Sequence, residues 1–82
     1  MATKQKKVSI YSTPTCHWCN TAKEFFDAHG IKYDSYDVQS DLARRKEMIQ
    51  KSGQMGVPVI YVDDTLVLGY DEDKLRELLN IR

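Results

Sequence analysis

The apolar and polar residues of this chain follow two periods, one typical of strands and one typical of helices. Four short runs rich in β-branched and aromatic residues predict strands over residues 8–11, 31–38, 59–62 and 65–68. Only Asp63 and Asp64 separate the last two runs, and this spacing indicates a β-hairpin.

Apolar residues at helical spacing predict three helices, over residues 16–29, over residues 42 to about 52, and after Asp71. Asp41 and Asp71 are suited to cap the second and third helices, and Gly30 and Gly53 to end the first two. The apolar faces carry Ala22, Phe25, Phe26 and His29, then Met48 and Ile49, and finally Leu75, Leu78, Leu79 and Ile81.

The predicted element order is β-α-β-α-β-β-α. The first two strands are joined through a helix and should be parallel, whereas the hairpin adds antiparallel pairs. We therefore expect an α/β sandwich, a four-stranded mixed sheet flanked by helices on both faces. The aromatic residues and one methionine on the expected core faces are assigned to packing: Phe25, Phe26, Tyr33, Tyr36, Met48 and Tyr61.

Size and charge restrict the class of protein. The 82 residues correspond to a single domain over 1–82, with a flexible basic tail expected over residues 1–7. Twelve basic and twelve acidic residues cancel, which argues against a nucleic-acid partner or a polybasic membrane patch. No apolar run approaches the roughly 20 residues that span a bilayer, and none resembles a signal peptide. We expect a cytoplasmic protein.

The two cysteines are the main chemical feature. Cys16 and Cys19 stand three residues apart at the start of the first predicted helix, where unpaired N–H groups and the helix dipole stabilise a thiolate. In the cytosol such a pair is typically catalytic or metal-binding, and as a bridge it would close a loop too small to stabilise the fold much. A C-x-x-C pair beside a β-α-β pattern indicates thiol–disulfide exchange. Cys16 is the expected nucleophile and Cys19 the resolving thiol.

Three other residues bear on the chemistry of the cysteine pair. A protonated His17 would favour the thiolate and so tune the acidity of the pair; the alternative is an exposed ring with little effect. Trp18 is expected to contact a bound peptide rather than only to cover the helix start. Pro58 precedes a predicted strand, and the residues alone favour a trans Val57–Pro58 bond, with a cis bond as the alternative.

Three sequence blocks resemble those of the glutaredoxins. They are Y-S-T-P-T-C-x-x-C at residues 11–19, S-G-Q-M-G-V-P at residues 52–58, and G-Y-D at residues 69–71. Their order and the element pattern extend the resemblance from Val8 to about Leu79. It implies the thioredoxin-like fold.

The resemblance also implies roles for individual residues. Pro58 would be cis and face the Cys16 sulfur, and the Val57 backbone would pair with substrate or glutathione as an added strand. Arg45 matches a position that contacts the glycine carboxylate of glutathione. Asp71 and Glu72 match the helix start that holds its γ-glutamyl end.

The sequence departs from the family pattern at four places. The usual C-P-Y-C is Cys16-His17-Trp18-Cys19, a lysine is replaced by Thr13, and a threonine by Gly56. The usual Gly-Gly pair is Gly69-Tyr70, whose added side chain could obstruct the γ-glutamyl pocket. This last change resembles the glutaredoxin-like donors that are reduced by thioredoxin reductase.

Residues and resemblance together imply a monomeric dithiol oxidoreductase acting on disulfide-containing or glutathionylated proteins. Glutathione would be its co-substrate, with no tightly bound cofactor. The alternative is an electron donor, for example to ribonucleotide reductase, that thioredoxin reductase reduces.

Two binding hypotheses belong to other classes. Structural zinc needs four ligands, and besides the cysteine pair the chain offers only His17 and His29 as histidines. A [2Fe–2S] cluster between two chains could use Cys16 of each chain together with glutathione.

Overall fold

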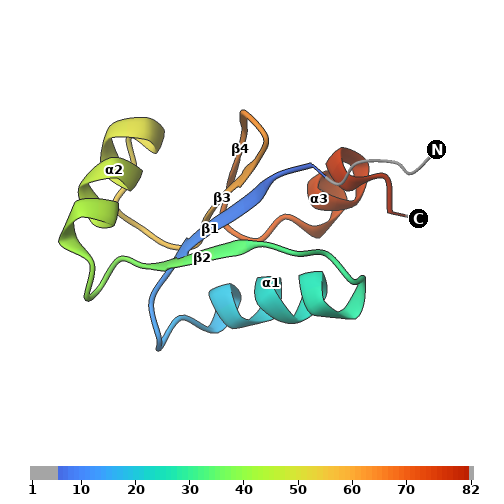
Figure 1. Cartoon of the computed structure of the whole chain (residues 1–82), viewed down its shortest axis with the longest axis horizontal. Coiled ribbons are helices and arrows are strands. Elements are labelled where there is room, and N and C mark those ends of the chain that lie inside the picture. The colour runs from blue at the N-terminus through green and yellow to red at the C-terminus, as the bar shows by residue number, and fades with distance from the viewer. Residues whose placement is uncertain (1–5, 82) are drawn as a thin grey trace.

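The computed structural model describes residues 6–81 and has the predicted element order (Figure 1). Helices lie on both sides of the sheet in Figure 1, as expected for an α/β sandwich. The elements are β1 (Val8–Ser12), α1 (His17–Ala28), β2 (Asp34–Asp37), α2 (Leu42–Ser52), β3 (Val59–Val62), β4 (Thr65–Leu68) and α3 (Glu72–Leu79).

The four strands form one mixed sheet in the order β2-β1-β3-β4. β1 and β2 are parallel, with Tyr11 opposite Tyr36, while the pairs β1–β3 and β3–β4 are antiparallel. The predicted sheet is therefore confirmed. β1 is one of the two inner strands, and the chain leaves its end into the turn that leads to Cys16 at the start of α1.

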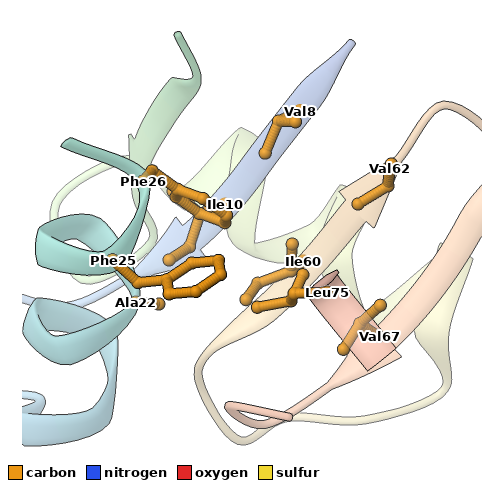
Figure 2. Packing of buried hydrophobic residues seen from close by; sticks show 9 residues of the cluster. All are labelled: Val8, Ile10, Ala22, Phe25, Phe26, Ile60, Val62, Val67 and Leu75. Atoms are coloured by element: carbon orange, nitrogen blue, oxygen red, sulfur yellow. The ribbon is translucent and has the colours of Figure 1, made fainter. Parts of the chain in front are cut away.

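One face of the sheet packs against α1 and α3. Figure 2 shows Phe25 and Phe26 of α1 pointing at the strands, with Leu75 of α3 in the same cluster. Strand residues on this face alternate with those on the other, as the pleat requires. The buried members are Val8, Ile10, Ala22, Phe25, Phe26, Ile60, Val62, Val67 and Leu75. This core fixes α1, and with it the cysteine pair, against the sheet.

The opposite face packs against α2 through a smaller cluster of Tyr11, Val38, Met48 and Val59. The Tyr11 hydroxyl is buried with its ring and donates a hydrogen bond to the Glu47 carboxylate. Arg44 donates to the same carboxylate, at 3.1 Å from Oε2 and 3.3 Å from Oε1. The hydrogen bond between Tyr11 and Glu47 connects β1 to α2 and gives the buried hydroxyl a partner.

The second predicted strand began too early. Residues 31–33 are not paired with β1, and the ladder between β1 and β2 begins with Ser9 opposite Asp34. Gly30 ends α1 in the left-handed region at φ 66°, and the Ile31 N–H donates to the Phe26 carbonyl at 2.8 Å. Ile31 and Tyr33 pack on the first core from a loop instead.

The last helix is shorter than predicted, and Ile81 lies beyond it. α3 ends at Leu79, and Asn80 takes a left-handed conformation at φ 57°. The Ile81 N–H then folds back onto the Arg76 carbonyl at 2.8 Å, so Ile81 reaches the core from outside the helix.

The predicted basic tail falls mainly on residues 1–5, which lie outside the described residues. The backbone of Lys7 forms two hydrogen bonds with Asp63. Its N–H donates to Oδ1 at 2.9 Å, and its carbonyl accepts from the Asp63 N–H at 2.7 Å. The structure therefore places Lys7 against the β3–β4 turn.

We predict that Glu47→Gln lowers the free energy of unfolding by about 1 kcal/mol near pH 7, because hydrogen bonds to a charged acceptor are the stronger kind. Hydrogen bonds from Tyr11 and Arg44 hold the pKa of Glu47 below its usual value. The extra stability is thus present above the unfolded-state pKa of about 4.3 and is lost as pH falls through the folded-state pKa.

Urea denaturation at several pH values measures this effect. The gap between wild type and Glu47→Gln should close as the pH falls through the folded-state pKa of Glu47. Gln50→Ala, an exposed change on the same helix, is the matched control and should leave stability nearly unchanged. A difference in the free energy of unfolding that does not change with pH would show that the charge of Glu47 does not contribute to stability.

Candidate active site

Cys16 is the N-cap of α1. A turn from Thr13 to Cys16, with Pro14 at its second position, brings the chain to the helix, and the Cys16 N–H donates to the Thr13 carbonyl at 3.3 Å. The Cys16 Sγ then accepts the Cys19 backbone N–H at 3.2 Å. The predicted helix over 16–29 is thus α1 with Cys16 and His29 as its two caps. The sulfur fills the place of a capping oxygen.

In the other two helices the N-cap residue is an aspartate. Asp41 accepts the Arg44 N–H at 3.1 Å, and Asp71 accepts the Lys74 N–H at 3.1 Å, each three residues on. Both predicted caps are confirmed. In α1 the same geometry is built with a thiol, so a negative sulfur at Cys16 meets the same amide donor and helix dipole as those carboxylates.

Cys19 has the opposite environment. Its side chain is fully buried beneath the helix start, whereas Cys16 is partly exposed, and both are free thiols. Burial, and then a hydrogen bond with Cys16, raises the pKa of Cys19 to about 12, against a smaller lowering by a backbone hydrogen bond at Thr13. Cys19 is therefore a protonated thiol at neutral pH, and Cys16 is the sulfur that a substrate can reach.

Val57 and Pro58 are joined by a cis peptide bond. The trans bond favoured by the residues alone is therefore wrong, and the cis bond implied by the resemblance is confirmed. Pro58 precedes β3, and its carbonyl accepts the Gly69 N–H at 2.9 Å. Among residues 6–81 no backbone hydrogen bond is made by Val57, so its N–H and carbonyl remain available.

A hollow of about 280 Å³ lies beside this bond. Trp18, from the first turn of α1, is 56% exposed and stacks nearly parallel on Tyr70, with ring centroids 6.1 Å apart and an interplanar angle of 16°. The structure thus brings Trp18 together with Val57 and Pro58, and contact of Trp18 with a bound peptide stays a prediction. The lining residues are Trp18, Val57, Pro58, Gly69 and Tyr70.

Glu72, at the start of α3, is held by two side chains of this chain. The Tyr70 hydroxyl donates to Oε1 at 3.1 Å, and the Arg76 Nε donates to Oε2 at 2.8 Å. These hydrogen bonds, that from Arg76 first, lower the pKa of Glu72, while burial and the bond to Glu72 raise that of Tyr70. Both carboxylate oxygens are already engaged.

The remaining predicted site residues lie at the edges. His17 is exposed on α1 and packs edge-on against Trp18, with ring centroids 5.2 Å apart. Arg45 is exposed on α2, and within residues 6–81 its side chain forms no hydrogen bond or ion pair. Asp71 caps α3, as described above. No cluster of three or more metal-ligating His, Cys, Asp or Glu side chains occurs in the described part of the chain.

Tyr70 was predicted only as a side chain that could obstruct the γ-glutamyl pocket, not as a residue of the site. It lines the hollow, stacks on Trp18 and binds Glu72. The one signal for it was its place in the block where a second glycine is usual. A larger hollow, of about 390 Å³, lies elsewhere and contains no cysteine; its lining is Lys7, Ser9, Tyr11, Lys51, Tyr61, Asp63 and Asp64. No helix within residues 6–81 is long and apolar enough to cross a membrane.

Comparisons with known proteins agree with this geometry. The family model described as glutaredoxin matches residues 8–67. An uncharacterized glutaredoxin-like 8.6 kDa protein in the rubredoxin operon of Clostridium pasteurianum is 38% identical over 72 residues, which are 88% of this chain and 96% of that protein. Glutaredoxin 3 of Escherichia coli strain K12 is 34% identical over 65 residues, 79% of this chain and 78% of that protein.

A solved structure supports the fold as well. The crystal structure of the thioredoxin-like protein BC3987 superposes with a TM-score of 0.84 at 30% identity, covering 89% of this chain and all (100%) of that one. The sandwich has the thioredoxin-like arrangement, and its helix-capping C-x-x-C pair stands where the family match falls. This chain belongs to the glutaredoxin family.

Proposed function

We propose that this protein is a dithiol thiol–disulfide oxidoreductase in which Cys16 attacks and Cys19 resolves. The Cys16 thiolate attacks one sulfur of a substrate disulfide, forms a mixed disulfide and releases the other sulfur as a thiolate that takes up a proton. Cys19 then loses its proton and attacks the Cys16 sulfur. The second substrate thiol leaves, two electrons have passed to the substrate, and Cys16 and Cys19 are oxidised to a disulfide.

The observation that carries this proposal is the unequal placement of the two sulfurs. Cys16 is partly exposed and accepts an amide N–H, whereas Cys19 is buried with its pKa raised to about 12. Besides burial, two of the causes that raise the pKa of Cys19 come from Cys16, its hydrogen bond and its charge. Both disappear once Cys16 is in a mixed disulfide, so Cys19 is more readily deprotonated when it must act.

Substrate binding would use the surface beside Cys16. The available N–H and carbonyl of Val57 suit strand addition by an extended peptide or by glutathione. Pro58 and Trp18 border the same hollow and would contact the bound segment. Asp71 and Arg45 would contribute only if glutathione binds, through the start of α3 and from α2 respectively, and His17 would tune the thiol by its charge.

The reductant that restores the dithiol is either glutathione or thioredoxin reductase. The γ-glutamyl ammonium of glutathione would seek a carboxylate, and Glu72 already binds Tyr70 and Arg76 through its two oxygens. Displacing them would cost glutathione part of its binding energy. This observation favours thioredoxin reductase as reductant over glutathione.

We expect Cys16→Ser to abolish reduction of disulfides, because serine at the cap offers no thiolate. Cys19→Ser should instead form mixed disulfides that do not resolve, since the attacking sulfur is kept. Mass spectrometry after mixing with a disulfide peptide distinguishes the two variants. Formation of the mixed disulfide by Cys16→Ser, and not by Cys19→Ser, would reverse the assigned roles.

We expect Tyr70→Gly to raise the glutathione-coupled rate about tenfold, because it removes the ring and frees one hydrogen bond to Glu72. The assay compares glutathione plus glutathione reductase with thioredoxin reductase as the source of electrons. Tyr70→Phe is the matched control: it keeps the ring, so only the contribution of the hydroxyl is lost. Equal glutathione-coupled rates for wild type and Tyr70→Gly would argue that Tyr70 does not restrict glutathione.

A further inference from the structure

Trp18, which follows Cys16 by two residues in the chain, forms a stacked aromatic wall with Tyr70. Trp18 lies between the two cysteines in sequence and presents more than half of its surface to solvent. Tyr70 makes three contacts. Its ring stacks on Trp18 and packs edge-to-face with Phe25, with ring centroids 6.0 Å apart, and its hydroxyl donates a hydrogen bond to Glu72. The exposed tryptophan is therefore supported by a ring that has little freedom to move.

The hollow bounded by this wall carries no charge. Its lining consists of two aromatic rings, a valine, a proline and a glycine. The Glu72 carboxylate that Tyr70 binds forms an ion pair with Arg76 at 2.8 Å, so its charge is balanced within the chain. By charge complementarity the occupant is an uncharged, apolar side chain, because a charged one would lose water and gain no partner.

The size of the hollow fits one side chain. Its volume of about 280 Å³ lies just below the range of small-molecule sites, which measure about 300–1,000 Å³. An extended peptide paired with the Val57 backbone would turn alternate side chains towards the same surface. A substrate cysteine that reaches Cys16 would therefore place on this surface the residues two positions away.

We propose that Trp18 and Tyr70 are specificity-determining residues that select protein disulfides with an aromatic or large aliphatic residue two positions from the attacked cysteine. The inference rests on the proposed function, and its covalent step is the exchange already described. It adds the substrate class: apolar protein segments are preferred, and charged ones are reduced slowly.

The test uses disulfide-linked pairs of the peptide Gly-X-Gly-Cys-Gly-X-Gly, with X as Phe, Leu, Ala, Glu or Lys. The fully reduced protein is mixed with each peptide, the reaction is quenched in acid, and the remaining disulfide is measured by chromatography. Each rate is divided by the rate with dithiothreitol, which removes the intrinsic reactivity of the peptide. Hydroxyethyl disulfide, which has no side chain at these positions, reports exchange alone.

We expect the Phe peptide to react about tenfold faster than the Glu peptide, as the energy of an aromatic contact allows. Trp18→Ala and Tyr70→Ala should each reduce this ratio to below about threefold, while Trp18→Phe and Tyr70→Phe should keep most of it. Because the ratio compares two peptides on one variant, a partial loss of folded protein cancels. Leu42→Ala, which removes an exposed apolar side chain on α2, should keep the full ratio.

The outcomes separate the two proposals. Equal normalised rates for all peptides, with hydroxyethyl disulfide still reduced, would overturn the specificity and leave the proposed function standing. An unchanged Phe-to-Glu ratio in both Trp18→Ala and Tyr70→Ala would also overturn it. Failure to reduce any disulfide, hydroxyethyl disulfide included, would overturn the proposed function itself.

Discussion

The hydrogen bond from the Cys19 N–H to the Cys16 sulfur is the interaction on which the site depends. An N-cap side chain binds the amide three residues on, and a C-x-x-C pair has that spacing. This hydrogen bond therefore caps α1 and orients the Cys16 sulfur. It also places Cys19 in the first turn of the helix, three residues after Cys16. Asp41 and Asp71 cap their helices in the same way. The same N-cap hydrogen bond therefore occurs in all three helices, and only in α1 is the capping atom a sulfur.

The hydrophobic core makes the two sulfurs unequal. Phe25 and Phe26 hold α1 against the sheet, and this packing buries Cys19 while Cys16 stays at the edge. Burial disfavours the charged form of a thiol, whereas an amide donor favours it. The same helix thus supplies a shielded thiol and an accessible one, and two chemically identical residues can take different roles.

Tyr70 links the site to the third helix. It lies between Gly69, which follows β4, and Asp71, the cap of α3, and its ring and hydroxyl act on different neighbours. The ring supports Trp18, and the hydroxyl occupies Glu72. Tyr70 thereby completes the aromatic surface that begins with Trp18. It also binds the Glu72 carboxylate, which a cationic ligand would need. Both effects bear on which disulfides and reductants the site accepts.

The elements, their order, the caps Asp41 and Asp71 and the redox pair Cys16 and Cys19 could be predicted from the sequence, because periodicity, capping and residue spacing are local. The sequence misjudged residues 31–33 and Ile81, whose positions depend on strand register and on a fold-back onto the core. The contact between Trp18 and Tyr70, and the cis bond at Pro58 beside it, were visible only in the folded structure. Contacts between residues some 50 positions apart arise when α1, β3 and α3 pack together, and no local pattern encodes them.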